Sequence, residues 1–220
     1  MFKGFTKQAS KFMWDLAFNN ERPWFNAHKQ EFEQLVMTPF KELACDTDRI
    51  MQQRHPDMGL MLHISRIYRD ARRLHGRGPY KDHLWFSLKN WDGLLQGPMF
   101  WFEFGAADYS YGMGFYSATA SQMQSFRAAV DANPARLERL ARTLEEQNEF
   151  YLTGEEYKRP KGDVGELLNP WYNRKWLGLE CSRDFGGDLL KAKLPEKLAD
   201  SFDFLMPFYE YFMQLCQPEE

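Results

Sequence analysis

The feature that most constrains the fold of this chain is the order of helix-like and strand-like hydrophobic patterns along its sequence. Apolar residues recur at helical spacing up to about residue 54, form short aromatic strand patterns between residues 60 and 117, and return to helical spacing from residue 121. Helices that flank a run of strands, without alternating with them, are typical of an α+β fold. We therefore predict a single α+β domain over residues 1–220, with a central, mainly antiparallel sheet and helices from both termini packed on it.

Turn-forming residues give the expected element boundaries. Pro23 suits the first turn of the second helix, Pro39 is expected to kink or restart that helix, and Pro207 is expected to restart the C-terminal helix. The predicted strands cover residues 60–70, 83–90, 99–105 and 109–117, with a further strand within 176–185. Residues 151–165 are rich in turn formers and are predicted to hold a short strand at most.

Composition narrows the class of protein. The 220 residues are 44% hydrophobic and 16% aromatic, which supplies a large core and argues against disorder. Uncharged apolar runs such as "GPMFWF" fall well short of the roughly 20 residues of a membrane span. The three cysteines lie far apart and form no CxxC pair, which disfavours a disulfide framework or a zinc ribbon. We expect a cytoplasmic protein that has no membrane association and needs no cofactor; its oligomeric state is left open.

One segment concentrates positive charge although the chain carries a net charge of −3. Residues 66–81, "RIYRDARRLHGRGPYK", contain five arginines, one lysine and a single acid, and are called the basic block below. If the preceding strand continues into the block, Arg66, Tyr68 and Asp70 point to one face and Arg69 to the other. Gly76 permits a turn, after which the chain returns beside the arginines.

Such a block suits an anionic ligand. Guanidinium groups bind carboxylates and phosphates through two parallel hydrogen bonds, and a glycine turn can add backbone donors. We assign Arg66, Arg69 and Arg72 as a clamp, with Lys81 as a point charge. Tyr80 is assigned as a phenol donor, and Asp70 as the acid that orients an arginine. The predicted ligand-binding residues are therefore Arg66, Arg69, Asp70, Arg72, Tyr80 and Lys81. The sequence offers neither a covalent nucleophile nor a metal site, and leaves open whether a reaction follows binding.

Two other interpretations of the block stay open. In the first, the arginines form a structural network with Asp70 and Tyr80 in a non-enzymatic interaction or scaffold module. The block could also contact the phosphates of a nucleic acid, but the acidic net charge makes this partner unlikely. An anionic small molecule is therefore the favoured partner, with phosphorylated molecules among the candidates.

The block also resembles a known signature. A family of conserved hypothetical proteins, classed only as a domain of unknown function, has approximately Arg-x-x-Arg-Asp-x-Arg-Phe, an acidic or Asn residue with Lys, and Pro-Tyr-Lys. The positions that match are Arg66, Arg69, Asp70, Arg72, Pro79, Tyr80 and Lys81. "NNERPWFNAHK" near the N-terminus is similar to that family's opening, so the resemblance extends over the chain. It implies no reaction, substrate or partner.

The match to the family signature is incomplete. Arg73 replaces the family's Phe, and Gly76–Arg77 replaces its acidic–Lys pair, so the turn has lost a carboxylate and gained positive charge.

Asp82–His83 next to Lys81 is suggestive of acid–base chemistry. The basic turn at residues 157–162 either widens the anion site or is a surface loop. Most of the strand aromatics are expected to be core residues, namely Trp85, Phe86, Trp101, Phe102 and Phe104.

Overall fold

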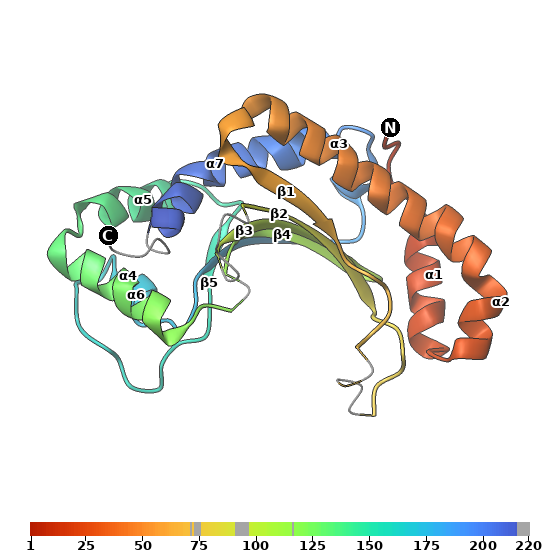
Figure 1. The fold of residues 1–220 in the computed structure, drawn as a ribbon, viewed down its shortest axis with the longest axis horizontal. Coiled ribbons are helices and arrows are strands. Elements are labelled where there is room, and N and C mark those ends of the chain that lie inside the picture. Colours follow the sequence, from red (N-terminus) through yellow and green to blue (C-terminus); the bar gives the residue numbers. More distant parts are fainter. Residues whose placement is uncertain (71, 73–75, 91–96, 116, 215–220) are drawn as a thin grey trace. The chain divides into compact units, whose positions relative to one another are not determined.

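The protein has an α+β fold built on a six-stranded antiparallel sheet, which confirms the predicted fold class (Figure 1). The computed structural model describes residues 1–220 except 71, 73–75, 91–96, 116 and 215–220. The strand order in the sheet is β1-β2-β3-β4-β6-β5. The strands are β1 (Leu60–Ile64), β2 (His83–Asn90), β3 (Met99–Gly105), β4 (Asp108–Gly114), β5 (Tyr151–Thr153) and β6 (Gly178–Asp184).

The chain divides into two compact units, each assembled from separate stretches of sequence. The first unit contains residues 1–88, 101–111 and 182–200, and the second contains residues 89–100, 112–181 and 201–220. The boundary between them falls within β2, β3, β4, β6 and helix α7 (Leu194–Gln214). The expectation of one domain over residues 1–220 stays a prediction.

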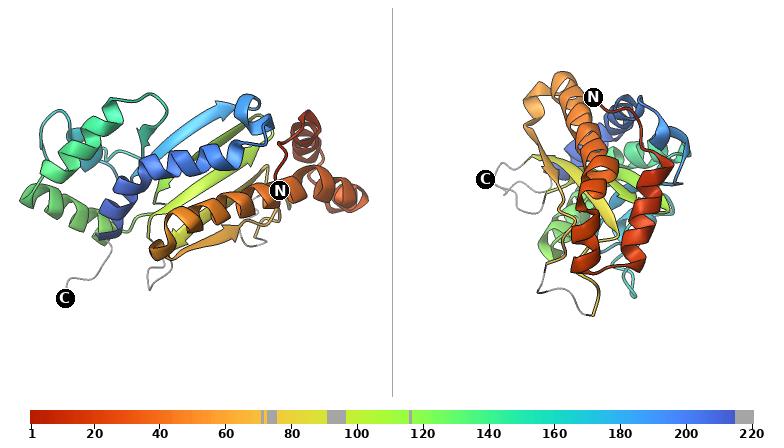
Figure 2. Two further views of the ribbon diagram at one scale, coloured as in Figure 1. Left: turned by 90° about the horizontal axis from the view of Figure 1, so that it is seen from above. Right: turned by 90° about the vertical axis from the view of Figure 1, so that its right-hand side faces the viewer.

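In the first unit, two N-terminal helices lie side by side and lead into a longer one. Helix α1 (Lys7–Phe18) and helix α2 (Arg22–Phe32) form a hairpin (Figure 2), in which Phe12 contacts Phe32 with ring centroids 5.8 Å apart. A π-helical turn, η1 (Glu33–Met37), joins α2 to α3 (Thr38–Arg54), which begins with Pro39 in its first turn. Because Pro39 has no N–H to donate to the preceding turn, the helix restarts there, as predicted.

Helix α3 covers one face of the strands of the first unit (Figure 1). The Phe40 ring of α3 lies 5.9 Å from that of Phe86 in β2 and 6.2 Å from that of Phe102 in β3. All three rings are fully buried. Residues alternate across a strand, so Trp85 and Trp101 point to the opposite face, where they are only partly buried. The predicted core assignment is thus correct for the phenylalanines and wrong for these two tryptophans.

The second unit packs helices through aromatic rings. Its helices are α4 (Ala120–Ala132), α5 (Ala135–Glu145), α6 (Asn169–Tyr172) and the C-terminal part of α7. Phe100 stacks on Tyr209 of α7 with centroids 4.7 Å apart, and Trp171 of α6 stacks on Phe208 at 6.2 Å. At Gly114, where φ is +154°, a Cβ atom would lie 2.4 Å from the carbonyl oxygen of Leu177, so only glycine fits.

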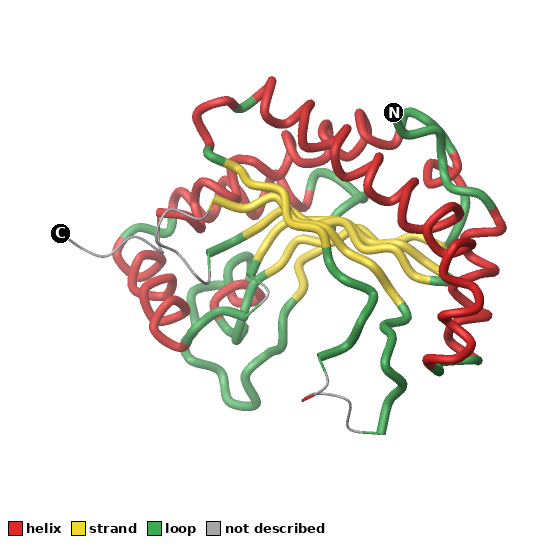
Figure 3. Tube along the Cα trace, turned by 45° about the vertical axis from the view of Figure 1, so that its right-hand side comes forward, coloured by secondary structure: helices red, strands yellow, loops and turns green. Residues whose placement is uncertain are grey.

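Two predicted boundaries are wrong. Helix α7 continues through Pro207 and does not restart there, because the apolar side chains on either side of it, including Met206 and Phe208, are buried and hold the helical path. Strand β1 ends at Ile64 and not near residue 70, and the chain then leaves the sheet as a loop (Figure 3). Among the helices that the structure describes, none combines the length and hydrophobicity that a membrane span requires.

Candidate functional site

The basic block returns to the sheet as a narrow two-stranded ladder. Tyr68 pairs with Tyr80 in an antiparallel bridge, and the Lys81 N–H donates to the Ile67 carbonyl oxygen at 2.7 Å. The Arg69 N–H donates to the carbonyl oxygen of residue 79 at 2.8 Å. These bonds place Arg69 beside the residues that begin β2, although the described residues of the block form an isolated bridge and not the predicted regular strand.

Asn20 fixes the returning segment to the turn between α1 and α2. Its Oδ1 accepts from the Tyr80 N–H at 2.9 Å, and its Nδ2 donates to the Tyr80 carbonyl oxygen at 3.0 Å. The Tyr80 ring stacks on Phe25 with centroids 4.2 Å apart and is 1% exposed. A Cβ atom at Gly78 would lie 2.3 Å from the Asn20 side chain, which explains the glycine. The asparagine turn and the Pro-Tyr-Lys segment, which both resemble the family signature, therefore meet at Tyr80.

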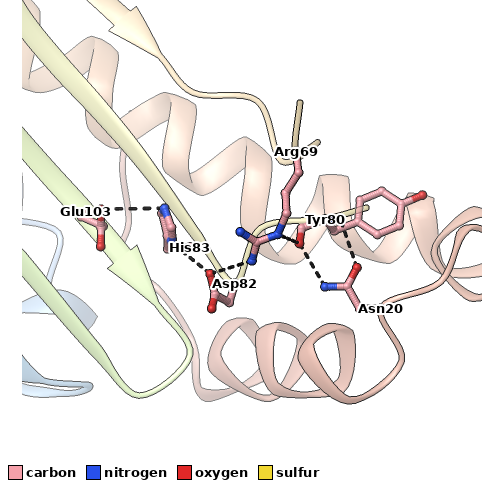
Figure 4. Close-up of polar contacts among 6 residues, drawn as sticks. All are labelled: Asn20, Arg69, Tyr80, Asp82, His83 and Glu103. Atoms are coloured by element: carbon pink, nitrogen blue, oxygen red, sulfur yellow. Dashed lines mark hydrogen bonds and ion pairs between the residues drawn. The ribbon is translucent and has the colours of Figure 1, made fainter. Parts of the chain in front are cut away.

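Arg69 is the arginine of the block that the structure holds most firmly. Its side chain is only 16% exposed. Its Nε donates to the Tyr80 carbonyl oxygen at 2.7 Å, and its Nη2 lies 3.3 Å from Asp82 Oδ1 (Figure 4). The guanidinium is thus neutralised by Asp82 and tied to the backbone, which makes Arg69 a structural centre of this turn.

A series of side chains with alternating charge, here called the charge chain, extends from Arg69 to β3. Asp82 Oδ1 lies 2.9 Å from His83 Nδ1, and His83 Nε2 lies 4.0 Å from Glu103 Oε2 (Figure 4). All three side chains are partly or largely exposed. An imidazole between two carboxylates can take a proton on one ring nitrogen and release one from the other, so this group can exchange protons with a ligand.

The two carboxylates of this chain have opposite pKa perturbations. Burial raises the pKa of Glu103 above its ordinary value, and the negative charges of Asp108 and Asp82 add to the effect, while His83 and Lys81 oppose it. Burial also opposes ionisation of Asp82, but its own backbone N–H, His83 and Arg69 outweigh burial and lower its pKa. Glu103 is therefore the better proton acceptor, and Asp82 stays ionised to orient His83.

Lys81 has a different environment from Arg69. Its Nζ lies 5.9 Å from the centroid of the Trp85 ring, and its side chain is partly buried. Burial lowers its pKa, as does the nearby charge of Arg69, while Glu103 raises it. Among the residues that the structure describes, no carboxylate or carbonyl oxygen accepts a hydrogen bond from its ammonium group.

These groups share one face of the sheet. Residues 81, 83 and 85 alternate to the side opposite Phe86, and Trp101 and Glu103 take the same side on β3. His63 of β1 adds a ring centred 5.2 Å from that of Trp85. We call the set Lys81, His83, Trp85, Trp101 and Glu103 the Trp85 face. Within the described part of the first unit, no helix covers it (Figure 1).

The structure distributes the predicted ligand-binding residues over different environments. Asp70 forms a two-oxygen ion pair with Arg72, whose Nη2 lies 2.7 Å from Asp70 Oδ2 and whose side chain is 88% exposed. Arg66 is exposed and has no ion pair among the described residues. Arg73 lies outside the described residues. No contact within the described chain joins Arg66, Arg69 and Arg72 into a clamp, and their binding to a ligand stays a prediction.

Sequence reasoning missed two residues of this region. Asn20 was recognised only as part of a turn, because its partner lies 60 positions away. Glu103 was read as part of an aromatic strand, and its approach to His83 depends on the register between β2 and β3. A search for ionisable residues on the face opposite the phenylalanines would have found both Glu103 and His83. Within the described residues, no three His, Cys, Asp or Glu side chains gather to hold a metal ion.

The fold and the Trp85 face define an α+β protein with a chain of charged side chains on its surface. The chain belongs to the conserved hypothetical protein family DUF2461, whose family model matches residues 8–211. The matched region includes Asn20, the basic block and Glu103, so the resemblance inferred from the sequence is confirmed at the level of the family. No match was found among curated proteins.

Proposed function

We propose that this protein binds an anionic small molecule at Lys81 on the Trp85 face. The observation that carries the proposal is the Lys81 ammonium, which is partly buried without an acceptor among the described residues. An ammonium that loses water and gains no partner is unfavourable, and a ligand carboxylate or phosphate supplies the missing partner.

The surrounding residues divide into contacts and positioning groups. Arg69 is a positioning residue, because its hydrogen bonds hold the segment that carries Lys81 and its charge adds to the positive potential there. Trp85 offers a flat apolar surface beside the charge, and Trp101 lies on the same face of the sheet. Glu103 and His83 provide proton exchange if the bound molecule reacts. Of the remaining described arginines of the block, Arg66 and Arg77 are both exposed, and either can supply a second contact.

A second candidate function is a non-enzymatic interaction module, in which the block only holds the fold together. The bonds of Arg69 and Asn20 to the Tyr80 carbonyl oxygen favour it. A nucleic-acid surface is the weaker alternative, and it would lose affinity with a log–log salt slope of about −0.9 for each duplex phosphate contacted.

A thermal-shift screen of wild type, Lys81→Met and Lys41→Met separates these functions. Lys41 is an exposed lysine on α3, so its variant is the matched control. The panel contains phosphorylated metabolites, dicarboxylates and short oligonucleotides at two salt concentrations. A ligand at about 100 times its Kd stabilises the folded state by roughly 2.7 kcal/mol, and we expect one small-molecule anion to do so in wild type and Lys41→Met only.

Other outcomes point away from the proposal. If no small anion stabilises wild type, or if Lys81→Met keeps the full shift, the site is not at Lys81. If Arg69→Met then melts far lower than wild type while no ligand acts on either protein, the block is a structural network. Stabilisation by oligonucleotides alone, lost at the higher salt concentration, would support the nucleic-acid surface.

A further inference from the structure

The second basic turn, residues 157–162, is held in place by one asparagine of the second unit. Asn173 follows helix α6, and its Oδ1 accepts from the Lys161 N–H at 2.6 Å and from the Gly162 N–H at 3.4 Å. Its Nδ2 donates to the Gly162 carbonyl oxygen at 3.1 Å, and its own carbonyl accepts from the Tyr157 N–H at 2.9 Å. The turn therefore has a defined shape without any bond to its basic side chains.

Two positive charges of this region lie against the ring of Tyr157. Lys161 Nζ is 4.6 Å from the ring centroid, and the guanidinium carbon of Arg127, on α4, is 5.6 Å from it. Each contact is attractive, but both cations lie near the same ring, so their like charges repel one another. Nη1 of Arg127 is buried and has no hydrogen-bond partner in the described structure, although the residue as a whole is only partly buried.

The acids near the turn are engaged elsewhere. Asp131 stands four residues after Arg127 on α4, but its Oδ2 accepts from the Tyr172 hydroxyl at 3.0 Å. Glu156 pairs with Arg174 at 3.3 Å, and Glu155 pairs with Lys175. Asp163 accepts from the Asn169 amide at 2.9 Å. Within the described chain, the basic side chains of the turn therefore lack a carboxylate partner; they are Lys158, Arg159 and Lys161.

We infer that Arg127, Tyr157 and Lys161 form a second anion site, which takes the terminal phosphate of a small phosphomonoester or pyrophosphate. A dianionic group balances both cations on the ring, whereas a single carboxylate balances one. Arg127 supplies forked donors and Lys161 a point charge, which is the usual division of labour at phosphate sites. Lys158 and Arg159 extend the positive potential over the approach to the site.

This inference does not depend on Lys81, because all of its residues belong to the second unit. The test is a calorimetric titration of pyrophosphate into wild type, Lys161→Met and Arg127→Met. Arg139→Met removes an exposed cation from α5 and is the matched control, and Lys81→Met shows whether pyrophosphate binds on the Trp85 face instead. We expect saturable binding that each site variant weakens roughly tenfold, with Arg139→Met within about twofold of wild type.

Two further arms decide the outcome. Citrate should bind more weakly than pyrophosphate, and an oligonucleotide without a terminal phosphate should compete poorly. The assignment is wrong if wild type shows no saturable binding, or if Lys161→Met, whose exposed side chain cannot disturb the core, binds as wild type does. It is also wrong if the oligonucleotide binds more tightly than pyrophosphate, or if Lys81→Met abolishes pyrophosphate binding.

Discussion

The two basic turns of this protein have similar compositions, but their basic side chains are paired with acids to different extents. In the basic block of the first unit, Arg69 pairs with Asp82 and Arg72 pairs with Asp70. In the turn at residues 157–162 of the second unit, the neighbouring acids pair with Lys175 and Arg174, and the basic side chains of the turn are left without them. The density of charge in a sequence therefore does not say whether that charge is available to a ligand. What decides is which partner each acid takes in the fold.

The asparagines that hold the two turns give the largest expected difference in stability. Asn20→Ala leaves the part-buried Tyr80 N–H without an acceptor, which we expect to cost about 2–3 kcal/mol of unfolding free energy. Asn173→Ala frees N–H groups next to exposed Lys161, where water replaces the bond, so we expect a cost of about 1 kcal/mol or less. Urea denaturation of the two variants measures both values. Equal losses would mean that the second turn is as deeply integrated in its unit as the first.

Much of the fold could be predicted from the sequence because it depends on local signals. The strands at His83–Asn90 and Met99–Gly105 are aromatic runs bounded by turn formers, and both were predicted at their observed ends. Strand β1 was overextended, because the apolar and basic alternation after Ile64 mimics a strand while the chain leaves the sheet. Pro207 was misjudged since the packing of its neighbours outweighs a local helix breaker.

The candidate site was less predictable because it depends on long-range partners. Lys81 was identified as a point charge, and its unpartnered ammonium agrees with that role without testing it. Tyr80 was assigned as a phenol donor, but its ring stacks in the core and its carbonyl oxygen makes the contacts with Arg69 and Asn20. No local pattern distinguishes these two uses of a tyrosine. The contribution of Glu103 required the register of two strands.

The charge chain of the first unit predicts pH effects of opposite sign. The pKa of Asp82 is lower in the folded state, so its ionised form stabilises the protein above its ordinary pKa and this stability is lost as the pH falls. The pKa of Glu103 is raised, so the folded state favours the protonated acid and stability falls as the pH rises through the range above 4.5. At neutral pH we expect Asp82→Asn to destabilise the protein and Glu103→Gln to stabilise it.

Denaturant unfolding of wild type and both variants between about pH 2 and pH 8 measures these slopes. The difference between wild type and Glu103→Gln should shrink toward acid pH, where the glutamic acid is protonated in both states. The difference in unfolding free energy between wild type and Asp82→Asn has the opposite sign, and it should also shrink toward acid pH. Two variants that shift stability in the same direction at neutral pH would contradict the electrostatic arrangement of the Asp82–His83–Glu103 chain.

The smallest expected effect on stability belongs to the two lysines assigned to ligands. Lys81 lies in a site that disfavours its charge, and exposed Lys161 contributes only a contact to Tyr157, so we expect Lys81→Met and Lys161→Met each to change the unfolding free energy by less than about 0.5 kcal/mol. Residues retained for binding need not stabilise the fold, and an unpartnered cation can even oppose it. Urea titrations at neutral pH provide the measurement, with Lys41→Met as the reference. A loss of about 2 kcal/mol or more would place Lys81 in the structural network with Arg69, or would make Lys161 a structural residue of its own turn, and the contrast between the paired and the unpaired charges would then disappear.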